Sequence, residues 1–417
     1  MTSRSAFAAG LGLLTVLGTS VRAQGAAAAD TAYDPVRELV GRLDLGRYKA
    51  TIAGLAKFGD RRQGTKRNRD AIDWIEAQLK SYGCQNIERV TYQYAPAPPA
   101  QRGAGAGGAG RGGAGRGNAS PDGRGRAGNG PGGSRIFSDM RERGVNNDSL
   151  AQPDPAIRAI NMEPSTPGER QEVICMKVGS THPEEMYIIG GHMDGIGWGQ
   201  AANDDASGSA IVMELARIFS MPDVKTDRSI RFALWNNEET GLNGARAYVE
   251  QRAAMQGKEV PAGSGKYPEP KWLGMIQHDM MMVDHGPPTA DGKLAPEQRA
   301  EADINIEFAI SSKKADEAMK MAFFWHVANN KYATHYPATV GPHMSNTDSD
   351  PFKDLVPSLS LRENERGAQI GGNWDPTHHQ PTDVLTTFTD KDYMLGLTSA
   401  QTTLGAVGQL TGATVKK

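Results

Sequence analysis

The feature that most constrains the fold of this chain is the alternation of short apolar strands and helices from residue 171 onward. The runs VICMKV and MYIIG are typical of short strands, and SIRFALW, at 229–235, is apolar throughout, as expected for a strand covered on both faces. Helical periodicity predicts helices at 207–219, 313–330 and 390–410. Strands and helices that alternate in this way predict an α/β fold, in which a mostly parallel sheet lies between helical layers.

The predicted domain also has a part upstream of this region. Residues 67–83 have the apolar spacing of an amphipathic helix that stops at Gly83, and the IERVTYQY that follows alternates as a strand does. We assign 24–96 to the N-terminal part of the domain and 171–417 to its main part.

The two parts are separated by a glycine-rich tract. Residues 97–134 have no periodicity and almost no bulky apolar side chain, so they cannot bury enough surface to offset their ordering entropy. We predict a disordered insertion over 97–170, with a weakly structured continuation from 135. The arginines of the tract resemble those of RNA-binding segments, but the flexible-linker interpretation is favoured. The formal net charge of −2 likewise gives no field that would attract nucleic acid.

The N-terminus has the pattern of a secretion signal. Arg4 precedes an apolar and small-residue run from Ala6 to Val21, and Val21-Arg22-Ala23 matches a small-residue cleavage site. We therefore predict a signal peptide at 1–23 and a secreted or periplasmic protein with no membrane attachment after cleavage. An uncleaved anchor is the alternative, and the short apolar run disfavours it.

The chain has two cysteines, Cys84 and Cys175. Export would permit a disulfide between them, but a sequence alone does not place their Cα atoms within bridging distance. The expectation from the sequence is two separate buried thiols.

Polar residues follow three of the predicted strands at the point where each strand ends. His192 and Asp194 follow MYIIG, Glu238 and Glu239 follow SIRFALW, and Asp279 follows LGMIQH. In open α/β sheets, ligands bind beyond the carboxyl ends of the strands. We therefore expect these side chains to converge at one edge of the sheet.

Imidazole and carboxylate groups without cysteine suit Zn²⁺ or a similar divalent ion. Besides His192 and Asp279, the chain offers one of Asp204 and Asp205, one of Glu238 and Glu239, and a late histidine in THHQPTD. Five such ligands fit two metals if one carboxylate bridges them, and the remaining glutamate could accept a proton from water. Any one of these residues alone would be an ordinary turn or cap; the whole set argues for a site.

At this point the chain resembles a known family, on the segments GGHMD (190–194), NDDASG (203–208), NNEETGLNGAR (236–246), QHD (277–279) and HHQPTD (378–383). It is similar to the dinuclear-zinc exopeptidases, which include secreted bacterial aminopeptidases, plasma glutamate carboxypeptidase and the divergent glutaminyl cyclases. The resemblance covers roughly residues 45–95 and 171–410. It implies a three-layer α/β/α fold with a mixed, mainly parallel central sheet.

The resemblance also implies a ligand set for two zinc ions per chain. His192 and Asp279 would bind one zinc, Glu239 and His379 would bind the other, and Asp204 would bridge them.

Two further residues receive catalytic roles from the same resemblance. Glu238 would be the general base, and Asp194 would hydrogen-bond His192 and fix its orientation. Relatives have a cis peptide after the bridging aspartate, so we predict one between Asp204 and Asp205. The adjacent His378 stands where relatives often have another residue type, and the spacing to Asp383 favours His379 over it as the ligand.

The function that the resemblance implies is that of a secreted zinc-dependent exopeptidase, first of all an aminopeptidase, that hydrolyses peptide bonds with metal-activated water. A carboxypeptidase or dipeptidase stays open because Arg362 and Arg366 could bind a substrate carboxylate. A glutaminyl cyclase and a metal-free receptor-like protein are weaker alternatives, because the full ligand set is present. A related amidohydrolase of the carboxypeptidase and deacylase type is weaker because residues 239–379 must also supply strands of the sheet, which leaves little room for the lid domain that such enzymes usually have. The expected partner is a peptide substrate, and the oligomeric state stays open.

Overall fold

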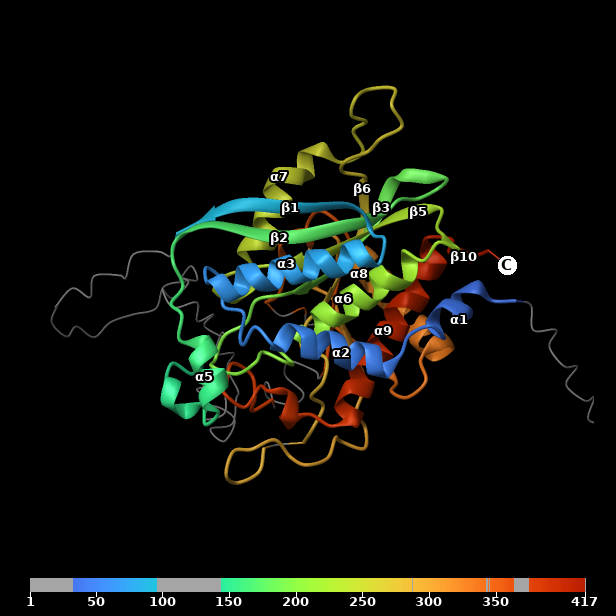
Figure 1. Cartoon of the computed structure of the whole chain (residues 1–417). Helices are drawn as coiled ribbons and strands as arrows, with labels where there is room; N and C mark the ends of the chain where they lie inside the picture. The colour runs from blue at the N-terminus through green and yellow to red at the C-terminus, as the bar shows by residue number, and fades with distance from the viewer. Residues whose placement is uncertain are drawn as a thin grey trace, which may run out of the picture. The chain divides into compact units, whose positions relative to one another are not determined.

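An eight-stranded sheet forms the centre of the computed structural model (Figure 1), which describes residues 33–95, 144–286, 288–342, 344, 346–363 and 375–416. The strand order is β1-β2-β5-β3-β6-β9-β7-β8. The strands are β1 (Gln85–Tyr94), β2 (Gly168–Lys177), β3 (His182–His192), β5 (Arg228–Trp235), β6 (Lys271–His278), β7 (Ile304–Glu307), β8 (Ala338–Gly341) and β9 (Ser358–Arg362). A two-stranded sheet pairs β4 (Val224–Lys225) with β10 (Thr414–Val415).

The middle of the large sheet is parallel. Strand β3 pairs in parallel with both β5 and β6, and β6 pairs in parallel with β9. Antiparallel pairs occur between β1 and β2, β2 and β5, and β7 and β9. The mixed, mainly parallel sheet expected from the sequence is therefore confirmed.

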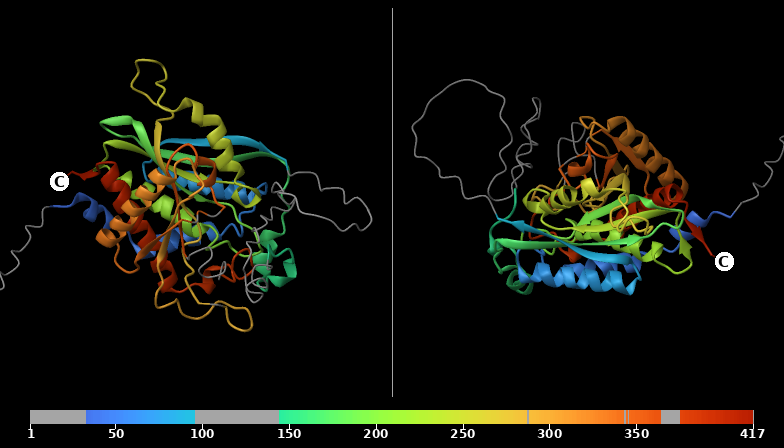
Figure 2. Two further views of the ribbon diagram at one scale, coloured as in Figure 1. Left: turned by 180° about the vertical axis from the view of Figure 1, so that it is seen from behind. Right: turned by 90° about the horizontal axis from the view of Figure 1, so that it is seen from above.

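Helices cover both faces of this sheet because the strand side chains alternate between two cores. Ile230, Phe232 and Leu234 of β5 join the core shared with most of the helices, whereas Ala233 and Trp235 join a second core beneath α7. The helices are α1 (Pro35–Val40), α2 (Leu45–Ala56), α3 (Lys66–Ser81), α5 (Pro155–Asn161), α6 (Ala206–Phe219), α7 (Asn243–Arg252), α8 (Ala315–Tyr332) and α9 (Asp390–Leu410). Figure 2 shows α3 and α7 on opposite sides of the sheet, as a three-layer fold requires.

The helices α3, α6, α8 and α9 lie within two residues of their predicted positions, whereas α2 was not predicted. α6 begins one residue before the expected start, α9 has the expected bounds, and α3 ends just before Gly83. Within the described ranges, no helix has both the length and the apolar character needed to cross a membrane. The predicted signal peptide at 1–23 lies outside the described residues.

The predicted extent of the insertion is wrong at its C-terminal end. Within 144–170, the structure has a short 3₁₀ helix at Ser149–Ala151, helix α5 and the start of β2. Asp154 caps α5 by accepting from two backbone N–H groups, and Pro155 occupies the first turn. These start signals are visible in the sequence, but seven residues are too few for a helical periodicity to stand out. The glycine-rich residues 97–134 lie outside the described part of the chain.

Deletion of residues 97–134, with a short flexible linker in their place, should leave folding and catalysis largely intact. The tract has no apolar periodicity through which it could contribute to a core. Thermal unfolding of the deletion variant and of the full chain, together with an assay of the peptide hydrolysis that the resemblance implies, measures this. A variant that fails to fold would show that the tract is structural.

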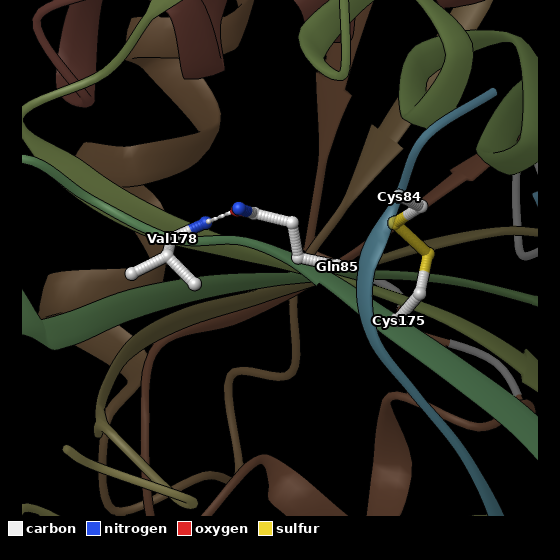
Figure 3. The surroundings of a disulfide bond; sticks show 4 residues. All are labelled: Cys84, Gln85, Cys175 and Val178. Atoms are coloured by element: carbon white, nitrogen blue, oxygen red, sulfur yellow. Dashed lines mark hydrogen bonds between the residues drawn. A yellow bond between two sulfur atoms is a disulfide. The ribbon is translucent and has the colours of Figure 1, made fainter. Parts of the chain in front are cut away.

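The expectation of two separate thiols is also wrong, because Cys84 and Cys175 form a disulfide (Figure 3). Strand β1 runs antiparallel to β2 with Gln85 opposite Met176, and this register brings the two cysteine Cα atoms to 6.0 Å. Val178 N–H donates to the Gln85 side chain at the same end of the strand pair. A register between strands so far apart in the chain is not visible in a sequence.

Replacing both cysteines with alanine should lower the free energy of unfolding by roughly 2–5 kcal/mol. The bridge joins residues 91 positions apart, so its loss gives much conformational freedom to the unfolded chain. Urea unfolding with and without reductant measures the effect, and the double variant serves as the control because reductant cannot change it. Equal midpoints for the oxidised and reduced wild type would contradict the prediction.

Candidate metal centre

The parallel centre of the sheet brings the predicted site residues to one edge. Strand β3 ends at His192, next to Trp235 at the end of β5, and Gly190 lies opposite Gln277 near the end of β6. Glu238 and Glu239 follow β5 in a short 3₁₀ helix, and Asp279 directly follows β6. The three strand ends therefore deliver their polar residues side by side, as the sequence predicted.

The five residues expected to bind metal lie together in the structure. His192 Nε2 is 3.2 Å from Asp204 Oδ1 and 3.7 Å from Asp279 Oδ1. On the other side of the same aspartate, His379 Nε2 is 3.1 Å from Asp204 Oδ2 and 2.8 Å from Glu239 Oε2. Asp204 thus stands between two histidines, and each histidine has a second carboxylate beside it.

The neighbouring aspartate has a different task. Asp205 caps α6 by accepting from Gly208 N–H, and its carboxylate also accepts from the backbone N–H groups of His192 and Met280. These backbone bonds occupy the side chain, so Asp204 is the member of the pair that faces the histidines. The peptide between Asp204 and Asp205 is cis, as predicted.

The two adjacent histidines are distinguished by their partners. His378 Nε2 lies 3.3 Å from Asp204 Oδ2, and the two imidazole rings are 3.9 Å apart between centroids. His379 additionally approaches Glu239, which places its ring between two carboxylates. The backbone of His379 has a φ of 57° and packs so closely on Gly197 that a Cβ there would clash with it.

Asp194 does not contact His192 in the way the sequence suggested. His192 Nδ1–H donates to the backbone carbonyl of Asp194 at 3.0 Å, whereas the Asp194 carboxylate lies 3.7 Å from the same nitrogen. The Asp194 carboxylate instead accepts from Glu238 N–H at 3.1 Å. Asp194 therefore orients both the histidine ring and the Glu238 backbone, through different groups.

Glu238 and Glu239 are both buried, and they approach different neighbours. Ligand atoms of Glu238, His192 and Asp279 lie within 4.8 Å of one another, and so do those of Glu239, His192 and Asp204. The preceding Asn237 has a φ of 67°, which turns the chain sharply at the end of β5. The two glutamates therefore belong to two overlapping groups of possible ligands, which share His192.

The donors fit a divalent cation such as zinc. Nitrogen and carboxylate oxygen are present without a thiol, which suits Zn²⁺. Among the described residues, Glu239 Oε1 is a buried oxygen without a hydrogen-bond partner, and Asp204 Oδ2 is a buried oxygen that lies near the imidazole nitrogens of His378 and His379. Burial raises the pKa of Glu239 to about 7, and the nearby Asp204 adds to this effect. A cation placed between these groups would satisfy the oxygens and relieve their repulsion.

Arg362 is a site residue that the sequence analysis assigned to a different task. It is the last residue of β9, and its guanidinium lies 2.9 Å from Asp279 Oδ2 and 3.7 Å from Glu307 Oε2. Its side chain is 1% exposed. The guanidinium of Arg362 therefore holds Asp279 Oδ2, the oxygen that does not face His192. The position of Arg362 at the end of a strand was the signal in the sequence that could have identified it as a site residue.

The chain is similar to a known family and to several known proteins. The profile of peptidase family M28 matches residues 172–395. Carboxypeptidase Q from Xenopus laevis is 38% identical over 73 residues, which cover 18% of this chain and 16% of that protein. An aminopeptidase from Pseudomonas aeruginosa (strain UCBPP-PA14) is 35% identical over 83 residues, or 19% of this chain and 15% of the relative. The chain thus spans only about a sixth of the length of these relatives in the matched regions.

Solved structures resemble the chain over most of its length. The aminopeptidase from Aneurinibacillus sp. strain AM-1 superposes with a TM-score of 0.54 at 18% identity, covering 91% of this chain and 96% of that chain. A glutaminyl cyclase from Porphyromonas gingivalis has a TM-score of 0.53 at 13% identity, covering 88% and 99% of the two chains. At such low identity the likeness shows the shared fold.

Proposed function

The chain belongs to peptidase family M28, whose profile matches more than half of its length, and from this premise we propose that it is a secreted zinc-dependent aminopeptidase. The proposal assigns two zinc ions to the chain. His192 and Asp279 would hold one, Glu239 and His379 would hold the other, and Asp204, which lies between them, would be shared by the two sets of ligands.

The observation that carries the proposal is the position of the Asp204 carboxylate. One of its oxygens faces His192 and the other faces His379, at 3.2 and 3.1 Å. Each histidine is accompanied by its own second carboxylate, so two sets of donors share a single aspartate. Zinc bound to such sets would polarise the scissile carbonyl and lower the pKa of the attacking water.

Within this scheme, Glu238 accepts the proton of the attacking water and returns it to the leaving amine. Its carboxylate lies beside His192 and Asp279, and its backbone is fixed by the bond to Asp194. A buried carboxylate that is held near the reacting water is well placed for general base catalysis.

The charges around the site favour an amino-terminal over a carboxyl-terminal specificity. Arg362, which could have bound a substrate carboxylate, is buried and shared between Asp279 and Glu307. Asp279 and Glu239 would be neutralised by the zinc ions that they hold, so this preference rests on the engagement of Arg362 by two carboxylates. Arg366, the other candidate, lies outside the described residues.

A panel of substrates with and without blocked termini tests the proposal. Aminoacyl-anilides and dipeptides with a free amino group should be hydrolysed, and their N-acetylated counterparts should not. Chelation should abolish the activity, zinc should restore it, and the metal content should approach two zinc ions per chain. Cleavage that requires a free carboxylate instead would indicate a carboxypeptidase, and release of pyroglutamyl products from N-terminal glutamine would indicate a cyclase.

A further inference from the structure

Two buried amide side chains stand out in the segment 144–163, which the sequence analysis assigned to the insertion. The segment joins the glycine-rich tract to β2, and its other side chains are mostly exposed or half-buried. Gln152 and Asn161, in contrast, are 2% and 4% exposed. Buried amides require hydrogen-bond partners, so the question is which groups they hold. We call residues 144–163 the clamp segment.

Gln152 bridges two loops with one nitrogen. Its Nε2 donates to the backbone carbonyl of Trp198 at 2.8 Å and to that of Pro381 at 2.9 Å. Its Oε1 accepts from Asp154 N–H at 3.0 Å, at the start of α5. The amide therefore has partners for both of its N–H bonds and for its carbonyl, with the short helix as its anchor.

The two bridged loops carry residues from both halves of the candidate metal centre. Trp198 lies in the loop that connects His192 to Asp204, and Pro381 comes two residues after His379. The Gln152 side chain thus connects the loop that leads to Asp204 with the loop that contains His379.

Further bonds of the clamp segment reach the same loops. Asn146 N–H donates to the backbone carbonyl of His379 at 3.1 Å. Asn161 Nδ2 donates to Gly199 O at 2.7 Å, and its Oδ1 accepts from Asp60 N–H at 3.0 Å. Since Gly197 packs directly against the His379 backbone, the His379 backbone is contacted by both the clamp segment and the 192–204 loop.

We propose that Gln152 is a positioning residue, which fastens the His379 loop to the Trp198 loop. It acts beside Asp383, whose carboxylate accepts from the N–H groups of Asn203 and Asp204, and thereby helps to set the distance between His379 and Asp204. Displacement of a reacting or binding group by about 1 Å can cost on the order of 10²-fold in rate. The inference rests on the proposed function where it predicts metal affinity, and on the hydrogen bonds alone where it predicts the mobility of the loop.

Variants of Gln152 separate these two consequences. Gln152→Glu keeps the size of the side chain but places a carboxylate against two carbonyl oxygens, and Gln152→Ala removes the bridge. Gln152→Asn keeps the amide but shortens the side chain by one methylene, so its N–H groups should not span both carbonyls. Asn329→Ala is the matched control, since Asn329 is a buried amide in α8 that donates to Tyr336 O and Thr402 Oγ1.

Hydrogen exchange of the metal-free protein is the first measurement. Peptides that cover 375–385 and 195–203 should exchange faster in Gln152→Ala and Gln152→Glu than in the wild type, with Gln152→Asn in between. Asn329→Ala should lower the melting temperature without changing exchange in these peptides. Wild-type exchange in all three Gln152 variants would overturn the proposal, whether or not the chain binds zinc.

Zinc affinity and kinetics are the second measurement. Competition with a chelator should show at least a tenfold weaker affinity for one of two zinc ions in Gln152→Glu, with kcat reduced more than KM is changed. Asn329→Ala should bind both ions as the wild type does.

A wild type that binds no zinc would contradict the proposed function, and faster exchange in the Gln152 variants would still support the clamp. If Gln152→Glu bound zinc as tightly as the wild type but exchanged hydrogen faster, Gln152 would only order the loops. Its proposed role in setting the position of the metal would then be overturned.

Discussion

Replacing Glu238 with glutamine should reduce the turnover of peptide hydrolysis by about 10²–10⁴-fold, the range typical for loss of a general base. Glutamine keeps the size of the side chain and much of its hydrogen bonding, but it cannot accept a proton. The backbone bond from Glu238 N–H to Asp194 does not involve the side chain, so the turn after β5 should stay in place. Zinc content and substrate binding should therefore remain close to those of the wild type.

Steady-state hydrolysis of an aminoacyl-anilide, measured together with metal content, checks this expectation. Glu250→Gln is a matched control, because Glu250 is an exposed residue of α7, and it should leave both quantities unchanged. Full activity of Glu238→Gln would show that another group accepts the proton. Loss of zinc from Glu238→Gln would show instead that Glu238 is a metal ligand.

Much of the site was predictable because parallel strands repeat one geometry. Each of β3, β5 and β6 is an apolar run that ends in polar residues, and the carboxyl ends of neighbouring parallel strands lie at one edge. The sequence therefore places His192, Glu239 and Asp279 at one edge of the sheet, and the order β5-β3-β6 then brings them side by side. The long helices were predictable for a similar reason, since α9 keeps its periodicity over 21 residues.

Adjacent residues of the same type were the limit of the sequence argument. Asp204 and Asp205 are chemically identical in a sequence, and only the resemblance to a family favoured the first. The structure separates them, since Asp205 is occupied by three backbone N–H groups. One of those groups belongs to Met280, which is 75 positions away, so no local pattern could have shown the difference.

Contacts between distant segments account for the rest of what was missed. The pairing of Cys84 with Cys175 depends on the register of β1 against β2, and the burial of Gln152 depends on loops that are 46 and 229 positions away. Arg362 has the charge of a substrate-binding residue, yet it is held by Asp279 and Glu307. In each case the residue type was visible, but the partner that decides its role was not.

Replacing Glu239 with glutamine should give the opposite pattern to Glu238→Gln, namely loss of metal with activity that can be recovered. Glu239 Oε2 lies 2.8 Å from His379 Nε2, and its other oxygen is buried without a hydrogen-bond partner. An amide is a neutral and weaker donor, so the cation held by Glu239 and His379 should bind less tightly. The loss should exceed the roughly 10–100-fold that follows removal of a residue that only supports a metal ligand.

In Glu239→Gln, the zinc position proposed for His192 and Asp279 should stay occupied. These two residues are unchanged, and Asp204 still faces His192 and His379. Metal analysis after dialysis should therefore find about one zinc ion fewer per chain than in the wild type. Added zinc should refill the weakened position by mass action and restore part of the turnover, which it cannot do for Glu238→Gln. The opposite result would be full metal content in Glu239→Gln and loss of an ion from Glu238→Gln. The roles of the two glutamates would then be exchanged, with Glu238 as the metal ligand and Glu239 as the proton acceptor.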